Sequence, residues 1–182
     1  MKKQILFALV ALLLALPSAQ AAKPNFIVVF CDDLGYGDIG PFGSTKHATP
    51  VLDKMAKEGM KLTDFYAAST VCAPSRCSLM TGMHTGHARI RGNREIQPEG
   101  QSPLAASAVT IPEVLGKAGY LSGRFGKWGL GAPGSEGDPM NQGFDRFYGY
   151  NCQRQAHTFY PSHLWSARKK VCLLYTSDAA AE

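Results

Sequence analysis

The feature that most restricts the fold is an uninterrupted apolar run, Asn-Phe-Ile-Val-Val-Phe, at residues 25–30. Such a run of β-branched and aromatic residues favours a strand that is buried on both faces, as in a parallel sheet. A helix is expected over residues 50–58 and a second strand over 60–66. Because a strand, a helix and a strand follow one another, the sequence predicts a βαβ crossover and an α/β fold with a mostly parallel sheet.

Two predicted helices carry clear end signals. Thr49 caps the first, Pro50 occupies its first position and Gly59 ends it. Thr110 and Glu113 form a capping box that opens a second helix over residues 111–118. A third strand is expected at 120–125. We assign these elements a packing role rather than a chemical one.

Two adjacent carboxylates, Asp32 and Asp33, follow the first predicted strand. The carboxyl ends of strands are where open α/β sheets place their sites. Neighbouring carboxylates repel each other unless a cation lies between them, and a hard divalent ion such as calcium prefers oxygen ligands. We therefore favour a metal site over the alternative, an exposed Asp-Asp turn. Cys31 is interpreted as a core residue, because calcium does not select sulfur.

The segment Cys-Ala-Pro-Ser-Arg at residues 72–76 is expected to open a short helix that Gly82 ends. Cys72 then lies at a helix N-terminus, where unpaired N–H groups favour an anion. Arg76, four residues later, reaches back toward the same end. A thiol, an anion hole and a guanidinium in one turn suit a tetrahedral oxyanion. The predicted crossover brings this turn to the sheet edge that carries Asp32 and Asp33.

Structural alternatives for Cys72 remain open. Cysteine is among the most buried residue types and is more often inert than reactive. Cys72 and Cys77 would also be able to form a disulfide in an oxidising compartment, which would describe a disulfide-stapled binding domain. The chain has five cysteines, at positions 31, 72, 77, 152 and 172, and an odd number in an exported protein leaves one unpaired or modified.

Four stretches in order resemble the formylglycine-dependent sulfatases of the alkaline-phosphatase superfamily. They are Asp-Asp-Leu-Gly-Tyr-Gly-Asp (32–38), Cys-x-Pro-Ser-Arg (72–76), Gly-Lys-Trp-x-Leu-Gly (126–131) and Gly-Phe-Asp-x-Phe-x-Gly (143–149). The resemblance implies a three-layer α/β sandwich, here truncated at its C-terminus. It also implies a sulfuric ester hydrolase resembling the arylsulfatases, acting on sulfated carbohydrate or aryl sulfates.

The resemblance assigns roles to individual residues. A maturation enzyme oxidises Cys72 to formylglycine, whose hydrate is the nucleophile. One calcium ion is bound by Asp32, Asp33 and residue 72, while Arg76 and Lys127 stabilise charge on the sulfate. The remaining metal ligands and a further lysine are expected beyond this chain, so the fragment alone is expected to be inactive.

One position departs from the pattern. Many sulfatases have histidine where this chain has Gly129, and that histidine helps to break down the sulfated intermediate. His157 is the candidate that we assign to the missing base. The departure keeps open a non-catalytic, secreted glycan-binding protein, beside a phosphate or phosphonate ester hydrolase of the same superfamily.

The two ends of the chain are expected to differ from the rest. A basic start, an apolar run and an Ala-x-Ala end predict a secretory signal peptide at residues 1–21, hence a periplasmic or secreted bacterial protein without a membrane span after cleavage. Residues 22–165 are predicted to form the N-terminal part of the catalytic domain. Residues 166–182 are interpreted as a non-native tail resembling translated sequencing adapter, with no element at 167–170.

Charge excludes one class of partner. The formal net charge is +5, but Lys2 and Lys3 leave with the predicted signal and residues 168–182 carry a further +1, so +2 remains for 22–167. Nucleic-acid binding requires a clustered basic face, so no nucleic-acid partner is expected.

Overall fold

The computed structural model describes residues 23–173. The predicted signal peptide and the end of the predicted tail, residues 174–182, therefore lie outside the described residues. In chain order the helices are α2 (Pro50–Glu58), α3 (Cys72–Thr81), α4 (Ile111–Lys117) and α5 (Gln153–Ala156); the strands are β1 (Gly123–Lys127), β2 (Arg146–Tyr150), β3 (His163–Ser166) and β4 (Lys169–Cys172). Short 3-10 turns occur at Tyr36–Asp38, Gly40–Phe42 and Pro139–Asn141.

The strands form one mixed sheet in the order β1-β2-β3-β4. β1 and β2 are parallel, in a register that runs from Gly123 opposite Arg146 to Lys127 opposite Tyr150. The other two pairings are antiparallel. The predicted α/β class is thus confirmed, and within the described residues the sheet contains one parallel pairing.

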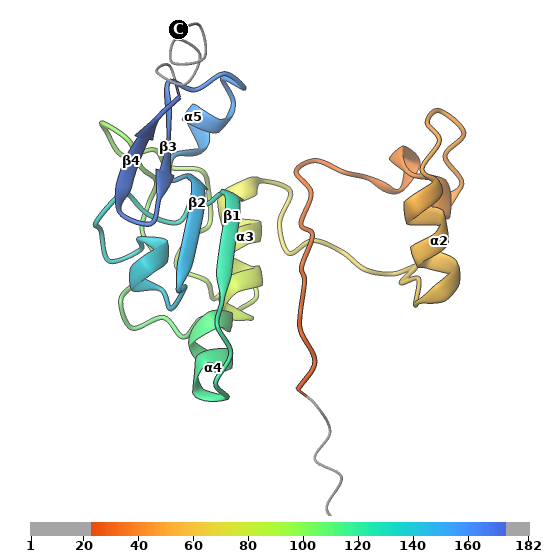
Figure 1. Cartoon of the computed structure of the whole chain (residues 1–182), viewed down its shortest axis with the longest axis horizontal. Coiled ribbons are helices and arrows are strands. Elements are labelled where there is room, and N and C mark those ends of the chain that lie inside the picture. The colour runs from red at the N-terminus through yellow and green to blue at the C-terminus, as the bar shows by residue number, and fades with distance from the viewer. Residues whose placement is uncertain (1–22, 174–182) are drawn as a thin grey trace, which may run out of the picture.

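The core lies between α3 and the sheet. Ala73, Cys77 and Met80 of α3 belong to one buried cluster with Trp128, which follows β1, and Phe147 of β2. The indole N–H of Trp128 donates to the Gly137 carbonyl at 2.7 Å, so this buried ring is also satisfied as a donor. Figure 1 shows α3 beside β1 and α4 below the N-terminal end of β1.

The predicted strand at residues 25–30 is wrong. The segment forms no strand, and Ile27 and Val29 are 89% and 80% exposed. The strand predicted over 60–66 is absent as well. A doubly buried strand needs a hydrogen-bonding neighbour and a covering layer on each face, and the described residues supply neither here. Both segments instead run to and from α2, which stands apart from the sheet (Figure 1).

The third predicted strand is shifted toward the C-terminus. It was expected at 120–125, whereas β1 covers Gly123–Lys127. The Asp145 carboxylate accepts the Ser122 N–H at 2.7 Å, and the Ser122 carbonyl accepts from the N–H groups of Asp145 and Arg146. These contacts turn the chain at Ser122, so the regular ladder starts one residue later.

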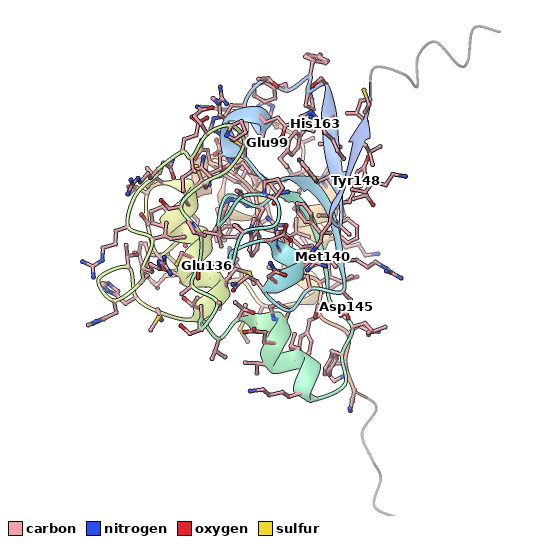
Figure 2. The ribbon with its side chains drawn as sticks, turned by 90° about the vertical axis from the view of Figure 1, so that its left-hand side faces the viewer. Glu99, Glu136, Met140, Asp145, Tyr148 and His163 are labelled. Carbon is pink, nitrogen blue, oxygen red and sulfur yellow. The ribbon has the colours of Figure 1, made fainter. Side chains whose placement is uncertain are left out.

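The expectation that no element begins at residues 167–170 is also wrong. β4 pairs with β3 over four residues, from His163 opposite Cys172 to Ser166 opposite Lys169. His163 is further held by Glu99, whose carboxylate lies 3.0 Å from the ring Nε2 (Figure 2). The boundary at residue 166 remains a prediction.

The predicted helix bounds are confirmed in α2 and to within one residue in α4, although Thr49 occupies the N-cap position of α2 without a capping hydrogen bond from its side chain. The first helix begins at Pro50 and its last turn closes through Gly59 N–H to the Met55 carbonyl. In α4, Glu113 accepts the Thr110 N–H at 2.8 Å, as the capping box requires, and the helix ends at Lys117. Within residues 23–173, no helix is long and apolar enough to cross a membrane.

Candidate functional site

Cys72 is the first residue of α3, as the sequence predicts. Its neighbour Val71 occupies the N-cap position and has no polar side chain to offer. Asn93, from a loop twenty-one residues later, supplies the missing group: its Oδ1 accepts the Ala73 N–H at 3.0 Å, while its Nδ2 donates to the Cys72 Sγ at 3.4 Å. Asn93 therefore caps the helix and fixes the half-exposed thiol at once.

Arg76 lies one turn further along α3 and is only 6% exposed. One of its guanidinium N–H groups donates to the Lys127 carbonyl, so α3 is tied to the end of β1. Its Nε has no partner within the described residues. Burial lowers the pKa of Arg76, and the charges of Asp32 and Cys72 act in the opposite direction.

Lys127 is the last residue of β1, and its side chain is 8% exposed. Its ammonium contacts the Asp32 carboxylate and lies 3.2 Å from Nε2 of His157. The end of the strand, the loop after residue 30 and the end of α5 therefore meet at one point. His157 was selected from the sequence alone, and the structure places it beside Lys127.

Asp32 is ionised at neutral pH in this setting. Burial works against its charge, but the hydrogen bond and charge of Lys127, with Arg76 and His157 further away, hold the pKa of Asp32 below its ordinary value. Asp33 adopts a left-handed backbone with φ of 55°, a region that is costly for most residues but tolerated by aspartate.

A cavity of about 890 Å³ lies at the start of α3. Asp32, Asp33, Cys72 and Arg76 all line it. The expected neighbourhood of the carboxylates and Cys72 is therefore present, although it arises without the strand predicted at residues 25–30.

Two further residues at the site were missed by the sequence reasoning. Asn93 contacts Cys72 from a distant loop, and no local pattern marks it. Arg124 on β1 donates to the same Lys127 carbonyl as Arg76, at 2.5 Å. Burial, together with the charge of Arg76, lowers the pKa of Arg124 to about 10. The period-two pattern of a strand would place Arg124 on one face, but it does not show that Arg76 lies opposite.

The acidic residues fit a hard divalent cation in part. Asp32 and Asp33 offer carboxyl oxygen ligands at the cavity, which suits calcium. Within residues 23–173, however, no three histidine, cysteine, aspartate or glutamate side chains gather closely enough to hold a metal ion. The metal set Asp32, Asp33 and Cys72 therefore remains a prediction.

All five cysteines lie in the described part of the chain, and each is a free thiol. Cys77 is buried in the core one turn beyond the half-exposed Cys72. The structure contains no Cys72–Cys77 disulfide, so it does not support that alternative.

Comparison with known proteins gives the family. The Sulfatase family model matches residues 24–178. The chain belongs to the sulfatase family. It is 43% identical to human arylsulfatase A over 150 residues, covering 76% of this chain and 28% of that protein. It is 36% identical to rat N-acetylgalactosamine-6-sulfatase over 158 residues, covering 82% of this chain and 30% of that protein.

Solved sulfatase structures agree with this assignment. The chain matches the structure of Ps i-CgsB with a TM-score of 0.68 at 30% identity, covering 78% of this chain and 35% of that one. It matches a Bacteroides thetaiotaomicron protein, from work on glycosaminoglycan metabolism, with a TM-score of 0.69 at 31% identity, covering 82% and 32%. The sulfatase chain described here thus spans about a third or less of the length of these relatives, and its alkaline-phosphatase-like fold class is confirmed.

Proposed function

We propose that this sulfatase-family chain carries the nucleophile end of a sulfuric ester hydrolase. The observation that carries the proposal is the convergence of Cys72, Arg76, Lys127 and Asp32 at the end of β1. A thiol and a guanidinium from α3 and an ammonium from the end of β1 meet one ionised carboxylate there. This arrangement suits an ester with a tetrahedral, negatively charged head better than it suits a neutral ligand.

We propose that Cys72 is converted to formylglycine by a maturation enzyme and that Asp32 and Asp33 hold calcium. Formylglycine would supply, as its hydrate, the nucleophilic hydroxyl, and calcium held by the two carboxylates would lower the pKa of that hydroxyl. Asn93 orients residue 72 through its amide. Arg76 and Lys127 hold the negative charge that grows on the sulfate and on the leaving oxygen, and His157 accepts a proton at Nε2.

The proposed substrates are sulfated carbohydrates or aryl sulfates. Ps i-CgsB has been solved in complex with k-i-k-neocarrahexaose, which supports a carbohydrate ester. A secreted or periplasmic location would give access to such polymers. The human relative named arylsulfatase A supports aryl sulfate as a convenient assay substrate.

The test compares aryl sulfate with aryl phosphate. The protein is expressed from its complete gene together with a formylglycine-generating enzyme, beside a Cys72→Ala variant. We expect hydrolysis of the sulfate ester that the variant loses by at least about a thousandfold, as is typical when a nucleophile is removed. Preference for the phosphate ester would instead support a phosphatase, and metal-dependent binding without turnover would support a glycan-binding protein.

A further inference from the structure

Buried polar atoms without partners concentrate in one short segment beside the site. Within residues 23–173, eight buried side-chain nitrogen or oxygen atoms have no hydrogen-bond partner, and four of them belong to residues 151–155. They are both amide atoms of Asn151, Nε2 of Gln153 and Oε1 of Gln155. Native proteins rarely leave such groups unpaired, so this concentration indicates a ligand that the segment is built to meet.

Gln153 fills the space that a side chain at position 129 would occupy. Gly129 has a φ of 77°, and a Cβ built on it would lie 2.7 Å from Cγ and Cδ of Gln153 and closer still to Nε2. Real Cβ atoms do not approach neighbours this closely. Gln153 itself is 3% exposed, so it has little room to move aside. The glycine and the glutamine are therefore complementary.

Gln153 is linked to the surroundings of Lys127 through His157 and through Gly129. It begins α5, and the His157 N–H, one turn later, donates to its carbonyl at 3.1 Å. Residues four apart share a helix face, so Gln153 lies on the face from which His157 reaches Lys127. Gly129, against which the Gln153 amide packs, follows Lys127 by two residues. The Gln153 amide therefore also lies near the residues that follow β1.

We propose that Gln153 is a sulfate-binding residue that takes the place of the histidine found at position 129 in many sulfatases. Its Nε2, which has two N–H donors and no partner, donates to an oxygen of the sulfate ester. The inference rests on the proposed function and deepens it by adding a residue to the sulfate site.

Sulfate binding and proton transfer are assigned to two different side chains, Gln153 in α5 and His157 at the C-cap of α5. A carboxamide does not titrate near neutral pH, so Gln153 contributes binding and charge stabilisation but takes no proton. The proton is left to His157, whose ring Nε2 lies 3.2 Å from the Lys127 ammonium. Loss of Gln153 should therefore lower affinity and rate without moving the pH profile, whereas loss of His157 should move the profile.

The experiment measures binding of inorganic sulfate and hydrolysis of an aryl sulfate by the protein expressed from its complete gene. Variants are Gln153→Ala and Gln153→Glu, with Gln97→Ala as the matched control, since Gln97 is exposed and its amide donates to Glu95 instead. Binding is measured on a Cys72→Ala background, which removes the chemistry. We expect sulfate affinity to fall about tenfold for Gln153→Ala and further for the anionic Gln153→Glu, with an unchanged pH profile of hydrolysis for Gln153→Ala and no change for Gln97→Ala.

The outcomes separate the two proposals. A protein that binds and hydrolyses sulfate but keeps its affinity in both Gln153 variants overturns the role of Gln153 and leaves the proposed function intact. A protein that neither binds sulfate nor hydrolyses its esters overturns both. If Gln153→Ala does not fold, Gln153→Asn provides the test, because it keeps the amide but withdraws it by one methylene, and it should weaken sulfate binding in the same direction.

Discussion

At the scale of single residues, the site depends on a thiol whose surroundings differ from those of its neighbours. Cys72 is half-exposed, begins a helix and accepts a hydrogen bond from Asn93, whereas Cys77 is sealed in the core. The same residue type therefore has two roles within one helix. Of these two thiols, only that of Cys72 is accessible to another molecule.

The first prediction concerns the modification of Cys72. After co-expression with a formylglycine-generating enzyme, the tryptic peptide covering residues 62–76 should be lighter by the exchange of a thiol for an aldehyde, as measured by mass spectrometry. Cys77 begins the next peptide and serves as an internal control that should keep its thiol. An unmodified residue 72 in this experiment would contradict the proposed nucleophile.

The second prediction concerns acid stability. The pKa of Asp32 is lowered in the folded chain, so Asp32 binds a proton more weakly in the folded state than in the unfolded state. Its contribution to stability is therefore present above the unfolded pKa of about 3.9 and is lost as the pH falls through the folded value. Thermal melting between pH 2.5 and 6 should show a shallower acid decline for Asp32→Asn than for the parent. Asp64→Asn, on an exposed loop, provides the control, and parallel acid limbs in parent and Asp32→Asn would refute the ion pair.

At the scale of elements, α3 depends on a cap supplied from outside its own sequence. Val71 brings no capping side chain, so Asn93 holds the first turn from another loop. The helix that begins at Cys72 is thus coupled to the folding of residues 83–94. A purely local description of the pentapeptide does not contain this coupling.

The third prediction follows from that contact. Asn93→Ala should cost about 1 kcal/mol of unfolding free energy, the usual loss for an N-cap, as measured by urea denaturation. It should also change the reaction rate of Cys72 with a thiol reagent, because the amide N–H that contacts Sγ is removed. Asn141→Ala is the control, since Asn141 also bonds through both amide atoms but lies away from Cys72. Equal thiol reactivity in Asn93→Ala and the parent would show that the contact does not govern Cys72.

At the scale of the whole molecule, a large apolar surface is left uncovered. A cavity of about 620 Å³ is lined by Phe26, Ile27 and Val28, together with Leu121 and Phe125 from the segment that enters and forms β1. Ile27 and Leu121 are 89% and 88% exposed. Contiguous apolar surfaces of this kind promote association in water.

The fourth prediction is that the 182-residue chain associates in a concentration-dependent manner. Sedimentation velocity should show a rising average mass with concentration, and the double variant Ile27→Ser, Leu121→Ser should reduce it. Val51→Ser is the matched control, because Val51 is also 70% exposed but lies on α2, away from this surface. A parent chain that stays monomeric at every concentration would contradict the prediction.

The sequence by itself determined α2, α3 and α4, the start of α3 at Cys72, and the family, because caps, proline, glycine and short motifs act within a few residues of one another. Cys72 at the start of α3, the Thr110–Glu113 capping box and the α/β class all follow from such local chemistry. The same sequence misplaced the strands. An apolar run indicates that a segment favours burial, but burial also requires neighbouring elements that cover it. Within the described residues, no strand pairs with residues 25–30, and Ile27 and Val29 stay exposed.

Only the tertiary structure decided which distant side chains complete the site. Asn93 reaches Cys72, Arg124 and Arg76 share one carbonyl, and Gln153 fills the space at Gly129. Apart from the contact between Arg124 and Lys127, these contacts join residues more than twenty positions apart, so no local pattern encodes them. In the sequence, Gly129 indicates only that a histidine is absent. In the folded chain, the buried amide of Gln153 occupies the space that a side chain at position 129 would need. The space available at one position depends on the side chain packed against it, which the sequence does not show.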